Sequence, residues 1–187
     1  MSDLTALPDE ELLARLQRGD LEVLGLLFDR YSDTLRRFCA RLQVPEEELD
    51  DLLQTLFLEL PNTARRFDTS RSAKPWLFGV TTMLVRRNRR SAARALRRLA
   101  RWRLDPPAPA EPVNPERETA ARELASRAQA ALAAMSHRKR EAFVLVALEG
   151  LSGEEAATLL DIPVATVWTR LHHARRELRS ALQEEVP

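Results

Sequence analysis

Apolar residues recur along most of the chain at steps of three and four positions, which is the period of an α-helix. Only five of the 187 residues are glycine, and alternating runs of β-branched residues, which indicate strands, are scarce. The sequence therefore predicts an all-α protein. Helices are expected at residues 9–18, from 20 to just before 45, 46–60, from 75 past 99, 116–134 and 137–149, followed by a helix-turn-helix.

Proline residues mark two of the expected helix boundaries. Pro61 is expected to end the third helix, because proline lacks the N–H that the next helical bond needs. A polar loop over residues 62–74 follows, and Pro75 suits the first turn of the long helix. The buried side of that helix is expected to include its later apolar positions, Ala92, Ala95 and Leu99.

Residues 104–116 differ in composition from the rest of the chain. They hold five of the eleven prolines, which is typical of a semi-extended linker that packs poorly. The sequence thus predicts two small helical domains joined by a proline-rich linker. The first domain is expected over residues 1–103, the flexible linker over 104–116 and the second domain over 117–187.

The most informative local pattern lies at residues 150–176 and predicts a helix-turn-helix. Ser152 and Glu155 have the spacing of a capping box, in which each side chain bonds the other residue's backbone N–H. Asp161 stands at the turn, where a left-handed residue is often needed, and Pro163 suits the first turn of the second helix. The inward stripe of that second helix is Val164, Val167, Leu171, Ala174 and Leu178.

The opposite face of this second helix is polar and basic. Arginine binds guanine edges or phosphates, and threonine meets a thymine methyl group or a phosphate, so this face suits the major groove of DNA. A solvated amphipathic helix in an ordinary helical hairpin is the alternative. The outward residues are Thr166, Trp168, Thr169, Arg170, His172, His173, Arg175, Arg176 and Arg179.

Charge is distributed unevenly on a chain whose net charge is only +1. Residues 86–103 contain nine arginines and no acid, whereas five of the six residues 46–51 are acidic. This polarity indicates one anionic and one basic partner. For the acids, the alternative is a favourable interaction with a helix N-terminus, which explains the first three positions better than the later ones.

Aromatic residues precede the arginine-rich segment. Phe67, Trp76 and Phe78, followed by the arginines, suit a groove that tracks a nucleic acid backbone and stacks exposed bases. The alternative is that the aromatic side chains belong to the core and that the arginines are solvated or ion-paired. The absence of a local counter-charge favours contact with nucleic acid.

Nothing in the sequence indicates an enzyme. There is no glycine-rich phosphate loop, no paired-cysteine metal site and no nucleophile–base constellation, so no metal or cofactor is expected. The single cysteine, Cys39, lies within an apolar rhythm and is expected to be a buried free thiol. A reducing, cytoplasmic setting fits this, as does the lack of a signal peptide or membrane-spanning run.

Over nearly its whole length, from about residue 9 to 182, the chain resembles the sigma factors of bacterial RNA polymerase, specifically the small two-domain extracytoplasmic-function group. Residues 48–57 are similar to the acidic helix of sigma region 2, which docks on the clamp helices of the polymerase β′ subunit. Residues 74–80 resemble the start of the helix that engages the −10 promoter element. Residues 132–143 and 150–176 resemble sigma region 4, which reads the −35 element and touches the β flap.

The resemblance implies an initiation subunit that gives core RNA polymerase its promoter specificity and performs no catalysis. An anti-sigma protein, which commonly holds this group inactive, is a further candidate partner. The implied polymerase contacts are Glu48, Asp50, Asp51, Gln54 and Phe57. The implied −10 contacts are Phe67, Lys74, Trp76, Arg86, Arg87, Asn88 and Arg90, with the loop from Phe67 to Lys74 as a pocket for an unstacked base. The implied −35 contacts are Thr166, Trp168, Thr169, Arg170, His173, Arg175 and Arg176.

The chain departs from the usual residues of this group at several positions. Thr55 replaces an acid, and Thr82 with Met83 replaces a common Arg-Asn pair. Asp161, Ala165, Trp168 and His173 also differ from the usual glycines and basic residues. We expect these changes to alter the promoter sequence that is read. They also leave a second function open, a sigma-like DNA-binding regulator or adaptor that does not itself direct polymerase.

Overall fold

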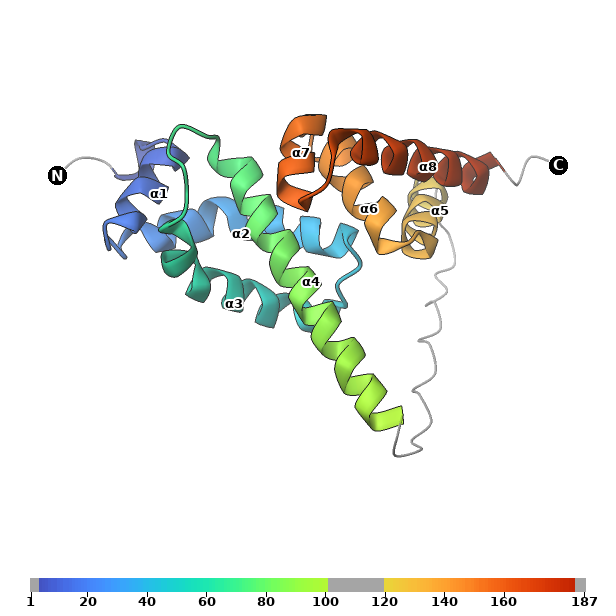
Figure 1. Ribbon diagram of the computed structural model, residues 1–187, viewed down its shortest axis with the longest axis horizontal. Coiled ribbons are helices and arrows are strands. Elements are labelled where there is room, and N and C mark those ends of the chain that lie inside the picture. The colour runs from blue at the N-terminus through green and yellow to red at the C-terminus, as the bar shows by residue number, and fades with distance from the viewer. Residues whose placement is uncertain (1–3, 101–119, 184–187) are drawn as a thin grey trace.

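The computed structural model describes residues 4–100 and 120–183, and all regular structure in these ranges is helical (Figure 1). The prediction of an all-α fold is confirmed. The expected linker, and with it the expected domain boundaries, lies outside the described residues. No helix in the described ranges is long and apolar enough to cross a membrane. The elements are a 3-10 turn at Leu4–Ala6, α1 (Asp9–Gln17), α2 (Val23–Arg41), α3 (Glu46–Ala64), α4 (Ala73–Ala100), α5 (Ala120–Ala134), α6 (His137–Phe143), the π-helical segment η2 (Val144–Leu148), α7 (Gly153–Leu160) and α8 (Val164–Gln183).

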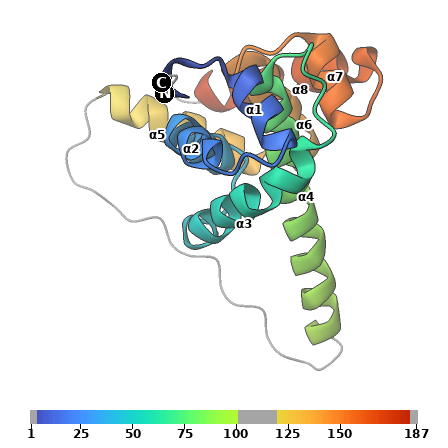
Figure 2. The same ribbon diagram turned by 90° about the vertical axis from the view of Figure 1, so that its left-hand side faces the viewer.

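The first half of the molecule is built from α1 to α4. Helices α1, α2 and α3 pack against one another, and the long helix α4 crosses them (Figures 1 and 2). Phe38 and Phe78 meet at the centre of this core, with their ring centroids 4.6 Å apart. Cys39 is a buried free thiol, as predicted, and burial raises its pKa to about 12 because the apolar surroundings disfavour the thiolate.

Helix α3 continues through Pro61 and ends at Ala64, so the prediction that Pro61 ends the third helix is wrong. Leu60 and Ala64, on either side of Pro61, are both fully buried. Their packing holds the last turn helical although Pro61 donates no hydrogen bond. The loop before α4 is correspondingly shorter than the sequence predicts.

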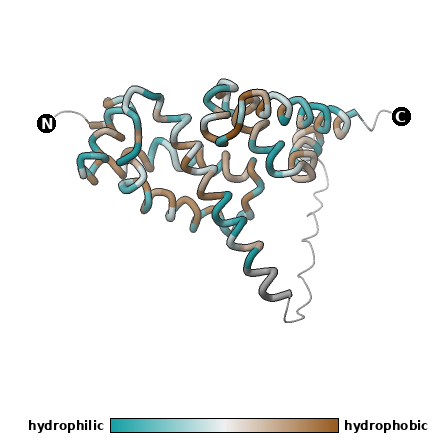
Figure 3. Tube along the Cα trace, in the orientation of Figure 1, coloured by the Kyte–Doolittle hydropathy of each residue, from teal (hydrophilic) through white to brown (hydrophobic). Residues whose placement is uncertain are grey.

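Helix α4 begins at Ala73, which places Pro75 in its first turn as expected. The prediction that Ala92 lies on a buried side is wrong, since Ala92 is exposed. By that point α4 projects away from the body of the molecule (Figure 1), and the hydropathy along its earlier turns is mixed (Figure 3). The side chains of Ala95 and Leu99 lie outside the described part of the chain.

The second half of the molecule is built from α5 to α8, with α8 packed against α5, α6 and α7. Its helix-turn-helix has the predicted geometry. The backbone N–H of Glu155 donates to Ser152 Oγ at 3.1 Å, and that of Ser152 donates to Glu155 Oε2 at 2.8 Å. Asp161 has the expected left-handed conformation, with φ 54° and ψ 55°. The helix predicted over residues 137–149 is divided, because α6 passes into the π-helical segment η2.

The two halves pack directly on each other and share one apolar core (Figures 1 and 2). Helix α7 lies against α4 at Gly79, where a Cβ atom would clash with the side chain of Leu159. Arg41 of α2 forms an ion pair with Glu149 at 2.6 Å. We call this packing of α2 and α4 against α6, α7 and residue 149 the closed arrangement.

Candidate nucleic-acid interface

The outward face of α8 has the character that the sequence predicts. Val167, Leu171 and Ala174 are buried and hold the helix against the second half. Arg175 and Arg176 are exposed, and neither forms an ion pair within the described residues. These two guanidinium groups are therefore available to an anionic partner.

Trp168 has a structural role that the sequence does not reveal. A Cβ atom on Gly153 would lie only 2.6 Å from the indole Cζ2 of Trp168, so the indole rests on the first residue of α7. The side chain is still 48% exposed. Trp168 thus braces the two helices of the motif with one side and presents the other to solvent.

The arginines of α4 are engaged differently from those of α8. Arg86 donates two hydrogen bonds to Glu141 of α6, at 2.8 and 2.6 Å, and Glu141 is 5% exposed. Arg87 donates to both carboxylate oxygens of Glu59 of α3, at 3.0 and 2.6 Å. These bonds raise the pKa of both guanidinium groups. Of the other predicted contacts on this helix, Asn88 is half-buried and Arg90 is exposed.

The prediction that this arginine segment has no counter-charge holds along the sequence but is wrong in space. The two carboxylates come from positions 28 residues before Arg87 and 55 residues after Arg86. In the closed arrangement Arg86 is therefore occupied by the protein itself and does not face DNA.

The loop before α4 is anchored in the core. Phe67 is only 4% exposed, and its ring lies 5.0 Å from that of Trp76, centroid to centroid. Gln17 donates to the backbone carbonyl of Phe67 at 2.7 Å. The prediction of a direct stacking contact through Phe67 does not fit this burial. Phe67 instead supports Trp76, which is half-buried, and the nearby Lys74 is exposed.

A tight turn follows Phe67 in this loop. Asp68 accepts hydrogen bonds from the backbone N–H of Ser70 at 3.0 Å and from its hydroxyl at 2.7 Å. These bonds stabilise the carboxylate and lower the pKa of Asp68. Lys74 Nζ lies 5.6 Å from the centroid of the Phe78 ring. The loop and the first turn of α4 therefore hold two charged side chains, Asp68 and Lys74, in defined positions.

The acidic face of α3 is exposed as the sequence predicts, with one difference. Glu48, Asp50, Asp51 and Gln54 all reach solvent, and Asp50 is ion-paired with Arg36 of α2. Phe57, predicted as a direct polymerase contact, is 6% exposed. It packs edge-on against Phe28, with ring centroids 4.9 Å apart, and lies in the core behind the acidic face. The apolar pattern of residues 24–42 predicts that Phe28 faces inward, but this is wrong, since Phe28 is the exposed member of the pair at 46%.

The sequence analysis also missed Arg140, a buried arginine at the junction of the two halves. Its guanidinium donates to three carbonyls around the end of α5, with the shortest bond at 2.6 Å to Leu132. It also reaches the carbonyl of Leu42 in the first half at 3.3 Å. Burial lowers the pKa of Arg140. Arg140 therefore satisfies carbonyls that the helix ends leave unpaired, which nothing in its sequence context signals.

The described residues contain one acidic helix and two basic helices, α4 and α8. Because α8 belongs to a helix-turn-helix, this arrangement is typical of a class of helical DNA-binding proteins. Residues 27–95 match the family model for sigma-70 region 2, and residues 125–178 match that for sigma-70, region 4. Within the described residues, no group of three or more His, Cys, Asp or Glu side chains is placed to hold a metal ion.

Comparison with characterised proteins identifies the family. The chain is 30% identical over 178 residues to the RNA polymerase sigma factor NccH of Alcaligenes xylosoxydans xylosoxydans, a match that covers 94% of this chain and 95% of NccH. It is 26% identical to the ECF RNA polymerase sigma factor SigW of Bacillus subtilis (strain 168), covering 92% of this chain and 95% of SigW. The solved structure of CnrH in complex with the cytosolic domain of CnrY aligns with a TM-score of 0.67 and 26% identity, over 95% of this chain and 99% of that one. The chain belongs to the extracytoplasmic-function (ECF) sigma factors of the sigma-70 family.

Proposed function

We propose that this protein binds core RNA polymerase, directs it to a specific set of promoters and initiates transcription there. The helix-turn-helix supports this most directly, because it joins a capped α7 and a left-handed Asp161 to a basic outer face on α8, in a chain that aligns nearly end to end with sigma factors. No step of this function requires catalysis by the chain itself. We place its action in the cytoplasm, where RNA polymerase works.

We assign the −35 element to α8, through Thr166, Thr169, Arg170, His173, Arg175 and Arg176, with the exposed side of Trp168 at the edge. The inward stripe fixes the helix, and exposed arginines supply phosphate and base contacts. We assign the −10 element to the start of α4 and the loop before it, through Lys74, Trp76, Arg86, Arg87, Asn88 and Arg90. Phe67 acts there as a buried support.

We assign the polymerase contact to the exposed acids of α3. Glu48, Asp50, Asp51 and Gln54 form a carboxylate-rich face that suits the basic surface of a clamp helix. Phe57 contributes indirectly to this contact, because its ring packs against the exposed Phe28.

The closed arrangement cannot serve both promoter elements at once. Arg86 is bound by Glu141, and α4 is packed on α7. We therefore propose that the halves separate on the polymerase, with residues 104–116 acting as the linker between domains 1–103 and 117–187. An anti-sigma protein is a candidate for the partner that controls this step, by analogy with CnrH, whose structure was solved with CnrY.

Run-off transcription tests the proposal. Promoter fragments are first selected from random DNA with the chain and core polymerase together, and the selected fragments are then transcribed. The expected result is a transcript with one defined start site. DNA binding without any transcript would instead identify an adaptor that does not direct polymerase.

The polymerase assignment has its own test. Asp51→Lys is expected to weaken association with core polymerase by about tenfold or more, because it reverses an exposed charge on the docking face. Binding of the −35 duplex should stay unchanged, since Asp51 is remote in sequence from α8 and lies on α3. Equal polymerase affinity would remove the acidic face from the contact.

A further inference from the structure

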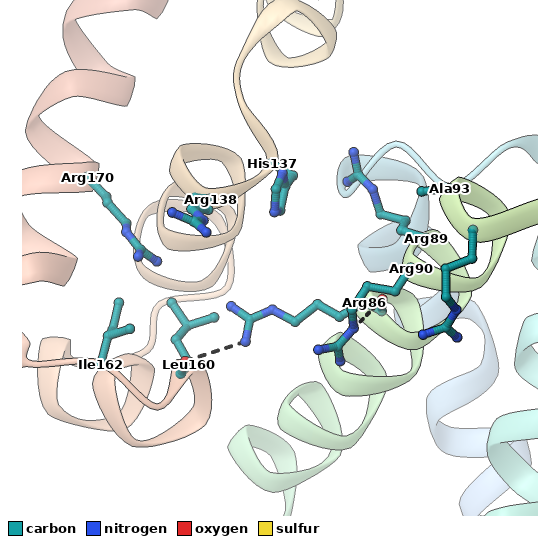
Figure 4. A pocket seen from close by; sticks show the side chains of 10 residues that line it. Arg86, Arg89, Arg90, Ala93, His137, Arg138, Leu160, Ile162 and Arg170 are labelled. Atoms are coloured by element: carbon teal, nitrogen blue, oxygen red, sulfur yellow. Dashed lines mark hydrogen bonds between the residues drawn. The ribbon is translucent and has the colours of Figure 1, made fainter. Parts of the chain in front are cut away.

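An open cavity of about 1160 Å³ lies between α4 and the second half of the molecule (Figure 4). Arginine side chains enter it from both walls. Those on the α4 wall are Arg86, Arg89, Arg90 and Arg94, and those on the opposite wall are Arg138 of α6 and Arg170 of α8. The sequence predicts the arginines of residues 86–103 and those of α8 as two separate surfaces. In the closed arrangement one arginine of α8, Arg170, faces the α4 arginines across this space.

The positive charge of this cavity is poorly compensated. Among its described lining residues there is no carboxylate, and the neighbouring Glu141 is engaged by Arg86. Burial and nearby arginines lower the pKa of His137 and of Arg170, although the carboxylate of Glu141 opposes this shift at both groups. Like charges gathered on two facing walls repel each other and oppose the closed arrangement. A multivalent anion between the walls would turn this repulsion into attraction.

The lining residues and the volume of the cavity indicate which class of anion could bind in it. Arginine binds phosphate oxygens with a planar, two-pronged geometry, and a chain of phosphates offers several such groups in series. The volume slightly exceeds the usual range for small-molecule sites, so one phosphate ion would leave most of it empty. Leu160 and Ile162 add an apolar edge beside the arginines (Figure 4).

We propose that this cavity binds an oligophosphate anion, either inorganic or carried by a nucleoside, and that the bound anion holds the two halves together. An anion that binds only the closed arrangement stabilises it by mass action. It also occupies Arg90 and Arg170, one from each proposed DNA surface. Competition with promoter binding follows if the proposed function holds, whereas the anion site itself requires only the closed arrangement.

Titration calorimetry of the full chain with inorganic tripolyphosphate, at about 150 mM salt, tests the site. The expected result is saturable binding of one anion per chain. The double variant Arg89→Gln/Arg138→Gln removes one charge from each wall and should weaken binding by at least about tenfold. Neither residue belongs to the proposed DNA contacts, so loss of anion binding and loss of promoter binding remain distinguishable.

The matched control is Arg37→Gln/Arg66→Gln, which removes two exposed arginines outside the cavity. Its affinity for tripolyphosphate should stay within about twofold of that of the unchanged chain. An equal loss of affinity for tripolyphosphate in both double variants, or the absence of saturable binding, would mean that the anion associates non-specifically with positive charge. Either result would overturn the proposal. Titration with ATP distinguishes an inorganic anion from one carried by a nucleoside. Tighter binding of ATP than of tripolyphosphate would indicate that the apolar edge holds the nucleoside, and equal binding would indicate that only the phosphate chain is bound.

A distance measurement tests the coupling to the closed arrangement. Spin labels at Leu58→Cys on α3 and Glu154→Cys on α7 report the separation of the halves, and both positions are exposed. Cys39 is buried with a raised pKa and resists labelling. Saturating tripolyphosphate should increase the short-distance population, most clearly when Glu141→Gln has weakened the closed arrangement. An unchanged distance distribution at saturation would refute the claim that the anion holds the halves together.

Discussion

The arginines at the junction of the two halves and those on the outer face of α8 are chemically identical but are used in opposite ways. Arg86 and Arg140 are held by carboxylate and carbonyl oxygens of the protein. Arg175 and Arg176 are exposed and form no ion pair within the described ranges. The two exposed arginines of α8 are thus available to an anionic partner in the closed arrangement, whereas Arg86 and Arg140 are engaged by the protein itself.

This difference shows that charge along a sequence is a poor measure of charge in a fold. Residues 86–103 contain no acid, yet two of their arginines have carboxylate partners from α3 and α6. Helix α8 contains Glu177 among its basic residues, yet that carboxylate pairs with Lys139 of α6. The sequence analysis identified both surfaces correctly as basic but could not rank their availability.

The largest expected effect comes from removing an arginine that the protein uses internally. Arg140→Ala should lower the free energy of unfolding by about 3 kcal/mol or more, because several buried carbonyls lose their donor. Urea denaturation followed by circular dichroism measures this. The matched variant Arg175→Ala should change stability by less than about 0.5 kcal/mol. Equal stabilities of the two variants would erase the contrast between the two sets of arginines.

What the sequence predicts well is what local interactions decide. The capping box of Ser152 and Glu155 and the left-handed Asp161 depend on neighbours within a few residues, and both are as predicted. The inward stripe of α8 follows from helical periodicity alone, and its central residues are buried. The helix-turn-helix and the buried stripe of its second helix were therefore predictable from the sequence.

What the sequence predicts poorly is what distant residues decide. Pro61 lies inside α3 because the core holds Leu60 and Ala64 on either side of it. Phe67 is buried because it packs on Trp76, and no periodicity distinguishes that from exposure. The partners of Arg86 and Arg140 depend on how the two halves meet, which leaves no mark on either segment alone.

Freeing Arg86 from its partner should make the α4 surface behave more like α8. Glu141→Gln is expected to weaken the closed arrangement by about 2 kcal/mol, since a nearly buried carboxylate loses its charge. Binding of a single-stranded −10 oligonucleotide, followed by fluorescence anisotropy, should tighten correspondingly. The matched variant is Glu59→Gln, which releases Arg87 from an exposed ion pair within the first half.

That control should cost no more than a few tenths of a kcal/mol, because exposed ion pairs contribute little. It should also leave the spacing of the halves unchanged. If both variants tightened −10 binding equally, the gain would come from net charge and not from opening.

Removing an arginine that is already available should weaken DNA binding without any change in stability. Arg175→Ala is expected to weaken binding of the −35 duplex several-fold and to reduce the slope of log affinity against log salt by about one, if the guanidinium neutralises one phosphate. Affinities measured at four or five salt concentrations give this slope. An unchanged slope would exclude Arg175 from phosphate contact, and Arg37→Ala, on α2, serves as the variant expected to have no effect.

The smallest expected effect is a pH dependence at the junction. Burial and the nearby Arg89 and Arg138 lower the pKa of His137 below its usual 6.5. The folded chain therefore binds fewer protons at His137 than the unfolded chain, so this contribution to stability is present above pH 6.5 and is lost as the pH falls through the lowered pKa. As the pH falls from about 7 to 5, the parent should therefore lose more unfolding free energy than the His137→Gln variant does. The difference should be small, because His137 is exposed. Saturating tripolyphosphate should reduce or reverse that difference, since an anion between the walls favours the protonated imidazole. If the pH-dependent difference is the same with and without the anion, the charge of the cavity does not influence His137. The contrast between the junction and α8 would then depend on the arginines alone.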